Sequence, residues 1–97
     1  SDSDVDIYVI PMNTKIESLK LANKLRNMGY KVELEMIDKR LKKSLDFANK
    51  EKIPYVIILG EDEIANNCFK VKDMFNNREF EVSMNNLEVI KEYIEKE

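Results

Sequence analysis

The sequence contains no histidine or tryptophan, and only one cysteine, two glycines and two prolines among its 97 residues. Without histidine, it lacks the commonest general base at neutral pH, imidazole metal ligands and histidine-activated nucleophiles. The single cysteine, Cys68, excludes an internal disulfide and a cysteine-based metal cluster. Two glycines are too few for a glycine-rich phosphate-binding loop. These absences remove most known catalytic arrangements, and we predict neither a catalytic residue nor a metal site.

The overall composition is that of one folded domain, with 43% hydrophobic and 36% charged residues. No apolar run approaches the roughly 20 residues that cross a bilayer. The first four residues are polar and acidic, unlike the start of a signal peptide. We therefore expect a cytoplasmic protein without a membrane partner. Because the sequence does not begin with methionine, we also expect a piece of a longer protein.

Hydrophobic patterns alternate between strand and helix over the first 59 residues. β-branched residues at 5–10 and a continuous apolar run at 55–59 predict strands, the second one covered on both faces. Strict alternation at 31–36 predicts a strand near a sheet edge with one solvated face. The helix between the strands at 5–10 and 31–36 is predicted to begin with a capping box of Thr14 and Glu17 and to end at Gly29. Its predicted buried face comprises Ile16, Leu19, Ala22, Leu25 and Met28.

A second helix is expected after Asp38 as its N-cap, with Leu41, Leu45 and Ala48 on its buried face. Alternating segments at 69–72 and 78–82 predict an antiparallel hairpin that turns at 74–77. A last helix begins near Asn85 and Glu88 and carries Leu87, Ile90 and Ile94. This order predicts a single α/β domain over residues 1–97, with a five-stranded mixed sheet flanked by helices.

The strongest local signal is a basic cluster formed by Lys39, Arg40, Lys42 and Lys43. With Asp38 these residues carry +3, which leaves −6 for the rest of a chain whose total is −3. The cluster falls where the second helix is predicted to begin, and on that helix positions 39, 42 and 43 share a face. Positive charges in the first turn of a helix interact unfavourably with the helix dipole and destabilise the helix by roughly a few tenths of a kcal/mol. Phosphate binding explains this placement; an ordinary solvated helix face is the alternative.

Three carboxylates, Glu61, Asp62 and Glu63, follow the buried strand at 55–59. Ligands of open α/β sheets bind at this edge. The three acids can chelate Mg²⁺, form an acid–base pair, accept hydrogen bonds from a guanine edge, or stabilise a helix N-terminus. Lys70 and Lys72 share one face of the predicted hairpin, a pattern more typical of a solvated sheet face than of a site.

Five stretches, at 7–11, 25–33, 39–48, 53–63 and 71–74, together resemble one known family. In this order and spacing they are similar to the C-terminal anticodon-binding domain of class IIa aminoacyl-tRNA synthetases, most closely the histidyl-tRNA synthetase version. The resemblance covers residues 5–95. Its most specific parts are the Leu-Lys-Lys run at 41–43 and the segment Ile-Leu-Gly-Glu-Asp-Glu at 58–63.

The resemblance implies a five-stranded mixed sheet whose edge meets the anticodon stem-loop of a tRNA. It assigns the phosphates of the anticodon arm to Lys39, Arg40, Lys42 and Lys43. It places Glu63 and Lys72 near the anticodon bases, with Asp38 and Lys70 as further base-reading candidates. The sequence departs from the family at two points, because Asp38-Lys39 and Asn66-Asn67 stand where glycine is usual.

The function implied is a non-catalytic domain that recognises histidine tRNA and binds no cofactor itself. The parent protein would be a histidine–tRNA ligase that uses ATP and Mg²⁺, dimerises, and contacts this domain through its catalytic domain. Two other hypotheses remain open. The same fold can serve as a protein-interaction or regulatory module in a synthetase-like paralogue, or Glu61, Asp62 and Glu63 can serve a small metal-dependent enzyme.

Overall fold

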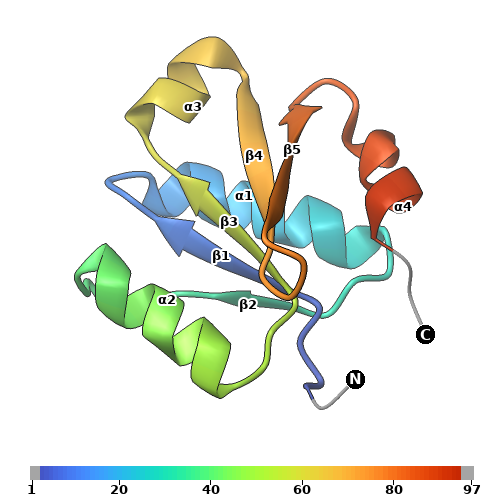
Figure 1. Cartoon of the computed structure of the whole chain (residues 1–97). Helices are drawn as coiled ribbons and strands as arrows, with labels where there is room; N and C mark the ends of the chain where they lie inside the picture. Colours follow the sequence, from blue (N-terminus) through green and yellow to red (C-terminus); the bar gives the residue numbers. More distant parts are fainter. Residues whose placement is uncertain (1–2, 95–97) are drawn as a thin grey trace.

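The computed structural model describes residues 3–94 and consists of a sheet with helices on both faces (Figure 1). The elements follow the predicted order, with one additional short helix, α3, after the third strand. They are β1 (Ile7–Pro11), α1 (Lys15–Asn27), β2 (Val32–Leu34), α2 (Leu41–Lys50), β3 (Tyr55–Leu59), α3 (Glu61–Asn66), β4 (Cys68–Asp73), β5 (Arg78–Ser83), a 3₁₀ turn (Leu87–Val89) and α4 (Ile90–Tyr93).

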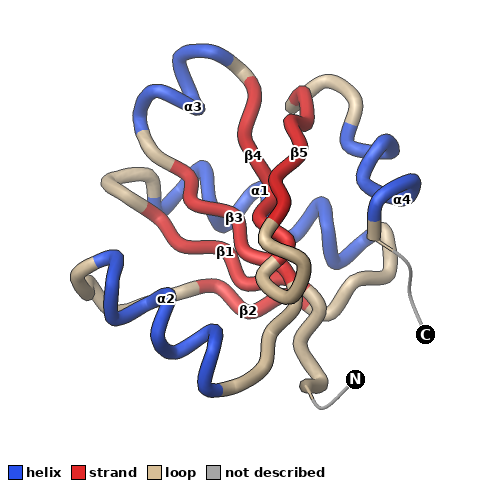
Figure 2. The backbone as a smooth tube through the Cα atoms, viewed as in Figure 1, coloured by secondary structure: helices blue, strands red, loops and turns tan. Residues whose placement is uncertain are grey.

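The five strands form one mixed sheet in the order β2-β1-β3-β4-β5 (Figure 2). β1 is parallel to β2 and β3, whereas β4 is antiparallel to β3 and β5 is antiparallel to β4. The predicted mixed sheet is therefore confirmed, with β3 at its centre and β2 at one edge. The hairpin turns at residues 74–77 as predicted, and Asn77 adopts a φ of 52° there.

The two faces of the sheet are covered unequally. α1 and α4 pack on one face over a large cluster that includes Val9, Ile57 and Val71. α2 packs on the other face over a smaller cluster that includes Tyr8 and Val56. This second cluster contains no residue of β5, and the alternating side chains of β4 and β5 on that face remain accessible to solvent. One half of this sheet face is consequently open.

The buried face of α1 differs from the predicted one. Ile16 and Leu19 are 65% and 44% exposed, whereas Ser18, Leu21, Ala22 and Leu25 are buried. An α-helix turns through 100° per residue, so residues spaced strictly three apart drift by 60° at each step. Ile16 and Met28 therefore cannot share one face, and burial follows the 3–4 spacing instead.

Of the two predicted N-terminal caps, Thr14 occupies the N-cap position of α1 without the predicted capping bond, and Asp38 is not the N-cap of α2. Thr14 precedes α1 but makes no capping bond; its hydroxyl instead donates to the carbonyl oxygen of Leu59 at 2.5 Å and lies 3.0 Å from the hydroxyl of Ser18. Asp38 does not cap α2, because that helix begins only at Leu41. In both cases a tertiary partner replaces the local one, since Asp38 pairs with Lys15 at 3.6 Å.

The end of α1 and the buried face of α2 match the prediction. Gly29 has a φ of 99° and follows α1 directly, which confirms the predicted left-handed C-cap. Leu41, Leu45 and Ala48 of α2 all pack toward the sheet as predicted. No helix within residues 3–94 is long and apolar enough to cross a membrane.

Candidate nucleic-acid interface

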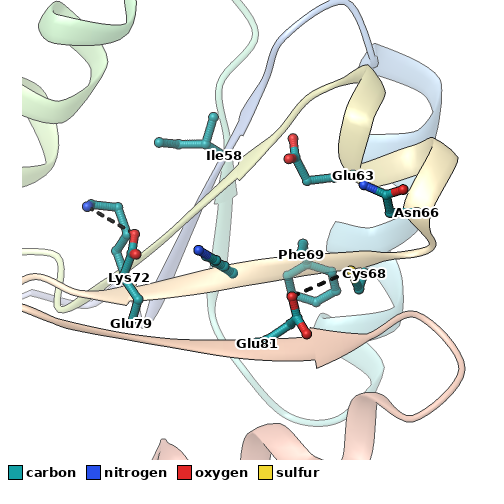
Figure 3. Close-up of a pocket in the computed structure, with 9 residues that line it drawn as sticks. Ile58, Glu63, Asn66, Cys68, Phe69, Lys72, Glu79 and Glu81 are labelled. Atoms are coloured by element: carbon teal, nitrogen blue, oxygen red, sulfur yellow. Dashed lines mark hydrogen bonds and ion pairs between the residues drawn. The ribbon is translucent and has the colours of Figure 1, made fainter.

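The open half of the sheet forms the floor of a cavity of about 360 Å³ under α3 (Figure 3). Lys72 from β4 and Glu79 and Glu81 from β5 line the floor, and Glu63 reaches in from α3. Lys70 of β4 lines the same cavity. The structure therefore brings together Glu63, Lys70 and Lys72, which lie up to nine residues apart in the sequence. The alternation of β4 explains the floor, because residues 70 and 72 point to the same side of a strand.

Charges on this floor are arranged in cross-strand pairs. Lys72 Nζ lies 3.3 Å from a carboxylate oxygen of Glu79, and Lys70 is directly opposite Glu81 in the register. Within residues 3–94, Lys70 has no carboxylate within ion-pair distance. The floor therefore offers one paired and one unpaired ammonium group beside two carboxylates, which suits a polar ligand carrying both donors and acceptors.

Cys68 lies at the end of the same cavity and is half-buried. Its thiol lies 3.8 Å from Glu81 Oε2. Burial and the neighbouring Glu81 carboxylate raise the pKa of the Cys68 thiol. A raised pKa favours the thiol over the nucleophilic thiolate.

Glu63 has a structural task as well as a place in the cavity. Its Oε1 atom accepts a hydrogen bond from the backbone N–H of Gly60 at 2.7 Å, which closes the first turn of α3. The second carboxylate oxygen makes no hydrogen bond within residues 3–94 and remains for a ligand. Glu61 and Asp62 occupy the same first turn and are exposed. No three acidic or cysteine side chains converge as metal ligands anywhere in residues 3–94.

The basic cluster is divided by the late start of α2. Because the helix begins at Leu41, Lys39 lies before it, and the prediction that positions 39, 42 and 43 share a helical face is wrong. Lys42 is in the first turn and pairs with Asp46 at 3.2 Å on the surface. Arg40 and Lys43 have no ion pair within residues 3–94. These two are the cations of the cluster that are available to a phosphate.

Lys39 is held against the protein. Its ammonium group lies 3.1 Å from a carboxylate oxygen of Glu35 and 4.9 Å from the ring centroid of Phe47, and its side chain is 29% exposed. An ammonium group in this position contributes to an ion pair and a cation–π contact at once. The predicted phosphate role of Lys39 thus competes with a structural one that the sequence did not suggest.

Glu35 is the residue that sequence reasoning missed. The alternation at 31–36 places it on a solvated face, but it is only 8% exposed. Its carboxylate accepts hydrogen bonds from the Tyr8 hydroxyl and from the Ile37 N–H at 3.1 Å, and it pairs with Lys39. Burial alone would raise the pKa of Glu35, but these hydrogen bonds and the Lys39 charge outweigh it and lower the pKa. No local signal identifies such a site, because its partners come from β1 and the segment after β2.

Burial and the bond to Glu35 raise the pKa of the Tyr8 hydroxyl well above its usual range. The ring of Tyr8 lies 5.3 Å from that of Phe47, centroid to centroid. Tyr8, Glu35, Lys39 and Phe47 therefore form one connected unit that fixes the start of α2 relative to β1. This unit positions Arg40, which follows directly after Lys39.

Asp38 lies apart from the other predicted base-reading residues. Its side chain is 90% exposed, and it lines a separate cavity of about 210 Å³ at the carboxyl ends of β1 and β2. Glu63, Lys70 and Lys72 do not line this cavity. The candidate site thus comprises the open sheet face, the two unpaired cations at the start of α2, and this second cavity.

Residues 6–94 match the sequence model of a family described as anticodon binding domain. Among curated proteins, histidine–tRNA ligase 1 of Bacillus cereus is 41% identical over 86 residues, which cover 88% of this chain and 20% of that protein. Histidine–tRNA ligase 2 of Shouchella clausii is 49% identical over 70 residues, which cover 72% of this chain and 16% of that protein. The chain spans about one fifth or less of the length of these relatives.

The fold is also found in solved structures. The histidyl-tRNA synthetase of Nostoc sp. PCC 7120 superposes with a TM-score of 0.82 and 26% identity, over 95% of this chain and 22% of that one. The RNA binding domain of threonyl-tRNA synthetase from Cryptosporidium parvum superposes with a TM-score of 0.83 over 95% of this chain and 24% of that one, at 13% identity, and so shares the fold.

Proposed function

This chain belongs to the anticodon binding domain family and is an anticodon-binding domain of the histidyl-tRNA synthetase type, and from this we propose that it recognises the anticodon stem-loop of histidine tRNA. The observation that carries the proposal is the open sheet face. A half of a sheet face that α2 leaves open, with two lysines on it and the half-buried carboxylate of Glu63 at its side, is a surface on which unstacked loop bases can lie.

Recognition of the bases is proposed to occur at Glu63, Lys70 and Lys72. The free oxygen of Glu63 is a hydrogen-bond acceptor, which suits the N1–H and N2–H groups of guanine, and a histidine anticodon contains guanine. The ammonium groups of Lys70 and Lys72 are donors, which suit base carbonyl oxygens. Because Lys72 is paired with Glu79 at 3.3 Å, it is already oriented before the RNA arrives.

Phosphate contacts are proposed at the start of α2. Arg40 and Lys43 are free of internal ion pairs among the described residues, and the N-terminus of α2 adds its backbone dipole to their charge. Lys42 is exposed and can exchange Asp46 for a phosphate. Lys39 contributes mainly by holding this segment in place. Asp38 lines the second cavity and is not one of these proposed phosphate contacts.

The wider protein is part of the same proposal. The matched segment makes up about one fifth of the relatives, which are histidine–tRNA ligases. We therefore propose a cytoplasmic, dimeric parent that contains a catalytic domain and uses ATP and Mg²⁺ there. A protein-interaction module in a synthetase-like paralogue is not favoured, because the relatives given above are named as ligases.

The test is titration of the isotope-labelled chain with a histidine-tRNA anticodon stem-loop, followed by NMR. Backbone shifts are expected in residues 38–43 and 60–72, and they should weaken as salt is added, because phosphate contacts release counterions. A stem-loop of the same length with an unrelated anticodon serves as the control. Equal shifts with both RNAs, or none with either at low salt, would overturn the proposal.

A further inference from the structure

The peptide unit between Leu59 and Gly60 is held at both ends by hydrogen bonds. Its carbonyl oxygen, on Leu59, accepts one bond from the backbone N–H of Met12 at 2.9 Å and one from the Thr14 hydroxyl at 2.5 Å. Its N–H group, on Gly60, donates to Oε1 of Glu63 at 2.7 Å. Because a trans peptide is planar, the bonds that fix the direction of the carbonyl also fix the direction of the N–H.

Thr14 connects this peptide to the interior of the protein. It is 2% exposed, and its hydroxyl lies 3.0 Å from that of Ser18, which is fully buried. Since the hydrogen of the Thr14 hydroxyl is directed to Leu59, the Ser18 hydroxyl is the donor between the two. The hydrogen bonds thus run in one direction, from Ser18 through Thr14 and the peptide to the carboxylate of Glu63. Hydrogen bonds in such a chain polarise and strengthen one another.

Gly60 leaves free the space next to the Glu63 carboxylate. A Cβ atom at position 60 would lie 2.9 Å from Oε1 of Glu63, which is too close for these atoms, and 3.8 Å from Cβ of Met12, which is an ordinary contact. The φ of Gly60 is −109°, in the extended region that any residue can adopt. Glycine is therefore required here by the position of the carboxylate and not by the conformation of the backbone.

These contacts decide which oxygen of Glu63 is available to a ligand. Oε1 is occupied by the Gly60 N–H, so Oε2 is the oxygen that remains. Glu63 is half-buried and lines the cavity over the open sheet face (Figure 3). A glutamate side chain that had to be ordered by the RNA would lose rotamer freedom on binding, which reduces affinity. The Glu63 carboxylate is instead oriented before a base arrives.

We propose that Thr14 and Gly60 are positioning residues for anticodon recognition, because they hold the Glu63 carboxylate in the one orientation that presents its free oxygen to guanine. The inference rests on the proposed function, in which Glu63 reads a base. Both residues act through Glu63 rather than on the base itself. Adenine presents the acceptor N1 where guanine presents N1–H, so a carboxylate that cannot rotate away disfavours adenine.

The first test measures the preference for guanine. Histidine-tRNA anticodon stem-loops, unmodified or with each anticodon guanine replaced by adenine in turn, are titrated into the wild-type chain and into Gly60→Ala. At the guanine that Glu63 reads, Gly60→Ala should reduce the wild-type preference for guanine about tenfold, the loss expected for one hydrogen bond to a charged group. In a Glu63→Ala background, Gly60→Ala should change this preference no further, because the carboxylate that it displaces is absent.

Ala65→Gly is the matched control for this test. It weakens the same helix, α3, at an exposed position and leaves residues 60 and 63 unchanged. Its preference for guanine should equal that of the wild type. A loss of preference in Ala65→Gly as large as in Gly60→Ala would show that loosening of α3 alone explains the effect, and would overturn the role of Gly60.

A second measurement tests Thr14 without RNA. The amide proton of Gly60 is hydrogen-bonded to a carboxylate, so its NMR signal should lie downfield. Thr14→Val removes the bond that polarises this peptide and should move the signal upfield, with a lower preference for guanine in the RNA titration. Thr14→Ser keeps a hydroxyl and should retain the wild-type signal and preference. An unchanged Gly60 signal in Thr14→Val would overturn the role of Thr14.

The RNA titrations also separate this inference from the function on which it rests. If the wild-type chain prefers guanine and both Gly60→Ala and Thr14→Val retain that preference, the positioning role is overturned and the proposed function stands. If the wild-type chain binds the unmodified and the adenine-substituted stem-loops equally, or binds neither, both are overturned.

Discussion

The hydroxyl of Tyr8 in β1 donates a hydrogen bond to the buried carboxylate of Glu35, which lies just beyond the end of β2. The backbone N–H of Glu35 also donates to the carbonyl oxygen of Val9 at 2.9 Å, so backbone and side chain together join the end of this edge strand to β1. Because Glu35 also holds Lys39, the bond extends to the segment that leads into α2. The position of the basic cluster thus depends on the buried carboxylate of Glu35.

Replacement of Glu35 by glutamine should lower stability at neutral pH by about 1–3 kcal/mol, as for other hydrogen bonds to charged groups. The folded state lowers the pKa of Glu35 below its ordinary value of 4.5. A depressed carboxyl pKa contributes stability above the unfolded value and loses it as the pH falls through the folded value. The difference between wild type and Glu35→Gln should therefore shrink below about pH 4.5.

Urea unfolding at a series of pH values measures this difference. Glu33→Gln, on the same strand, is the control and should behave like wild type. A gap between wild type and Glu35→Gln that stays constant down to acid pH would show that the charge of Glu35 is not what stabilises the fold.

Removal of the unpaired cations should change the salt dependence of RNA binding. Arg40→Ala combined with Lys43→Ala removes two proposed phosphate contacts, so the slope of log K against log salt should fall by about 1.4–1.8. Lys20→Ala combined with Lys24→Ala, two exposed residues of α1, is a matched control of equal charge change. An unchanged slope in the double variant would place the phosphates elsewhere.

Lys39→Ala should have a different effect, because Lys39 is tied to Glu35 and Phe47. We expect a loss of roughly 1–2 kcal/mol in the free energy of unfolding and little change in the salt slope. Unfolding and salt titrations on the same variant separate the two effects. If the slope of log K against log salt instead falls in Lys39→Ala by the amount expected for one phosphate contact, and the free energy of unfolding is unchanged, Lys39 is a phosphate-binding residue.

Two variants of Glu63 separate its two tasks. Glu63→Gln keeps an oxygen that can accept the Gly60 N–H, so stability should change by less than about 0.5 kcal/mol while discrimination between anticodons falls. Glu63→Ala loses the 2.7 Å bond as well and should cost about 1 kcal/mol. Thermal unfolding and competition between matched stem-loops measure these effects. Unchanged anticodon preference in Glu63→Gln would remove this residue from base recognition.

Truncation of leucines on α1 should reflect the observed face of the helix. Leu21 is 3% exposed and Leu19 is 44% exposed. Leu21→Ala should destabilise the chain by about 2–5 kcal/mol, and Leu19→Ala by no more than about 1 kcal/mol. Similar losses for the two variants in urea unfolding would mean that α1 is rotated relative to the structure described above.

Much of the architecture could be predicted from local pattern. The parallel strands follow from β-branched runs separated by helices, and the hairpin follows from two alternating segments around Asn77. The identity of the domain followed from motifs at 39–48 and 53–63, and the family match over residues 6–94 confirms it. The predicted buried face of α1 was wrong because it assumed a strict three-residue spacing, whereas burial follows the 3–4 spacing of an α-helix.

The features that the sequence could not predict depend on contacts between distant residues. Thr14 bonds to Leu59, 45 positions away, instead of capping its own helix. Glu35 is buried because Tyr8 reaches it from 27 positions away. The separation of Asp38 from Glu63, Lys70 and Lys72 likewise follows from how α2 and α3 sit over the sheet. The spacing of residues within one segment of the sequence does not indicate such contacts.

The open half of the sheet has one further consequence, for the entropy of binding. Lys72 of β4 is paired with Val56 of β3 and Glu79 of β5, and Lys70 is paired with Glu81 of β5, so the sheet already orders their backbone before a ligand binds. Loop-borne residues lose conformational freedom when they bind, whereas these lose only side-chain freedom. A rigid floor of this kind can hold a flexible RNA loop while nearly all of the ordering takes place in the RNA.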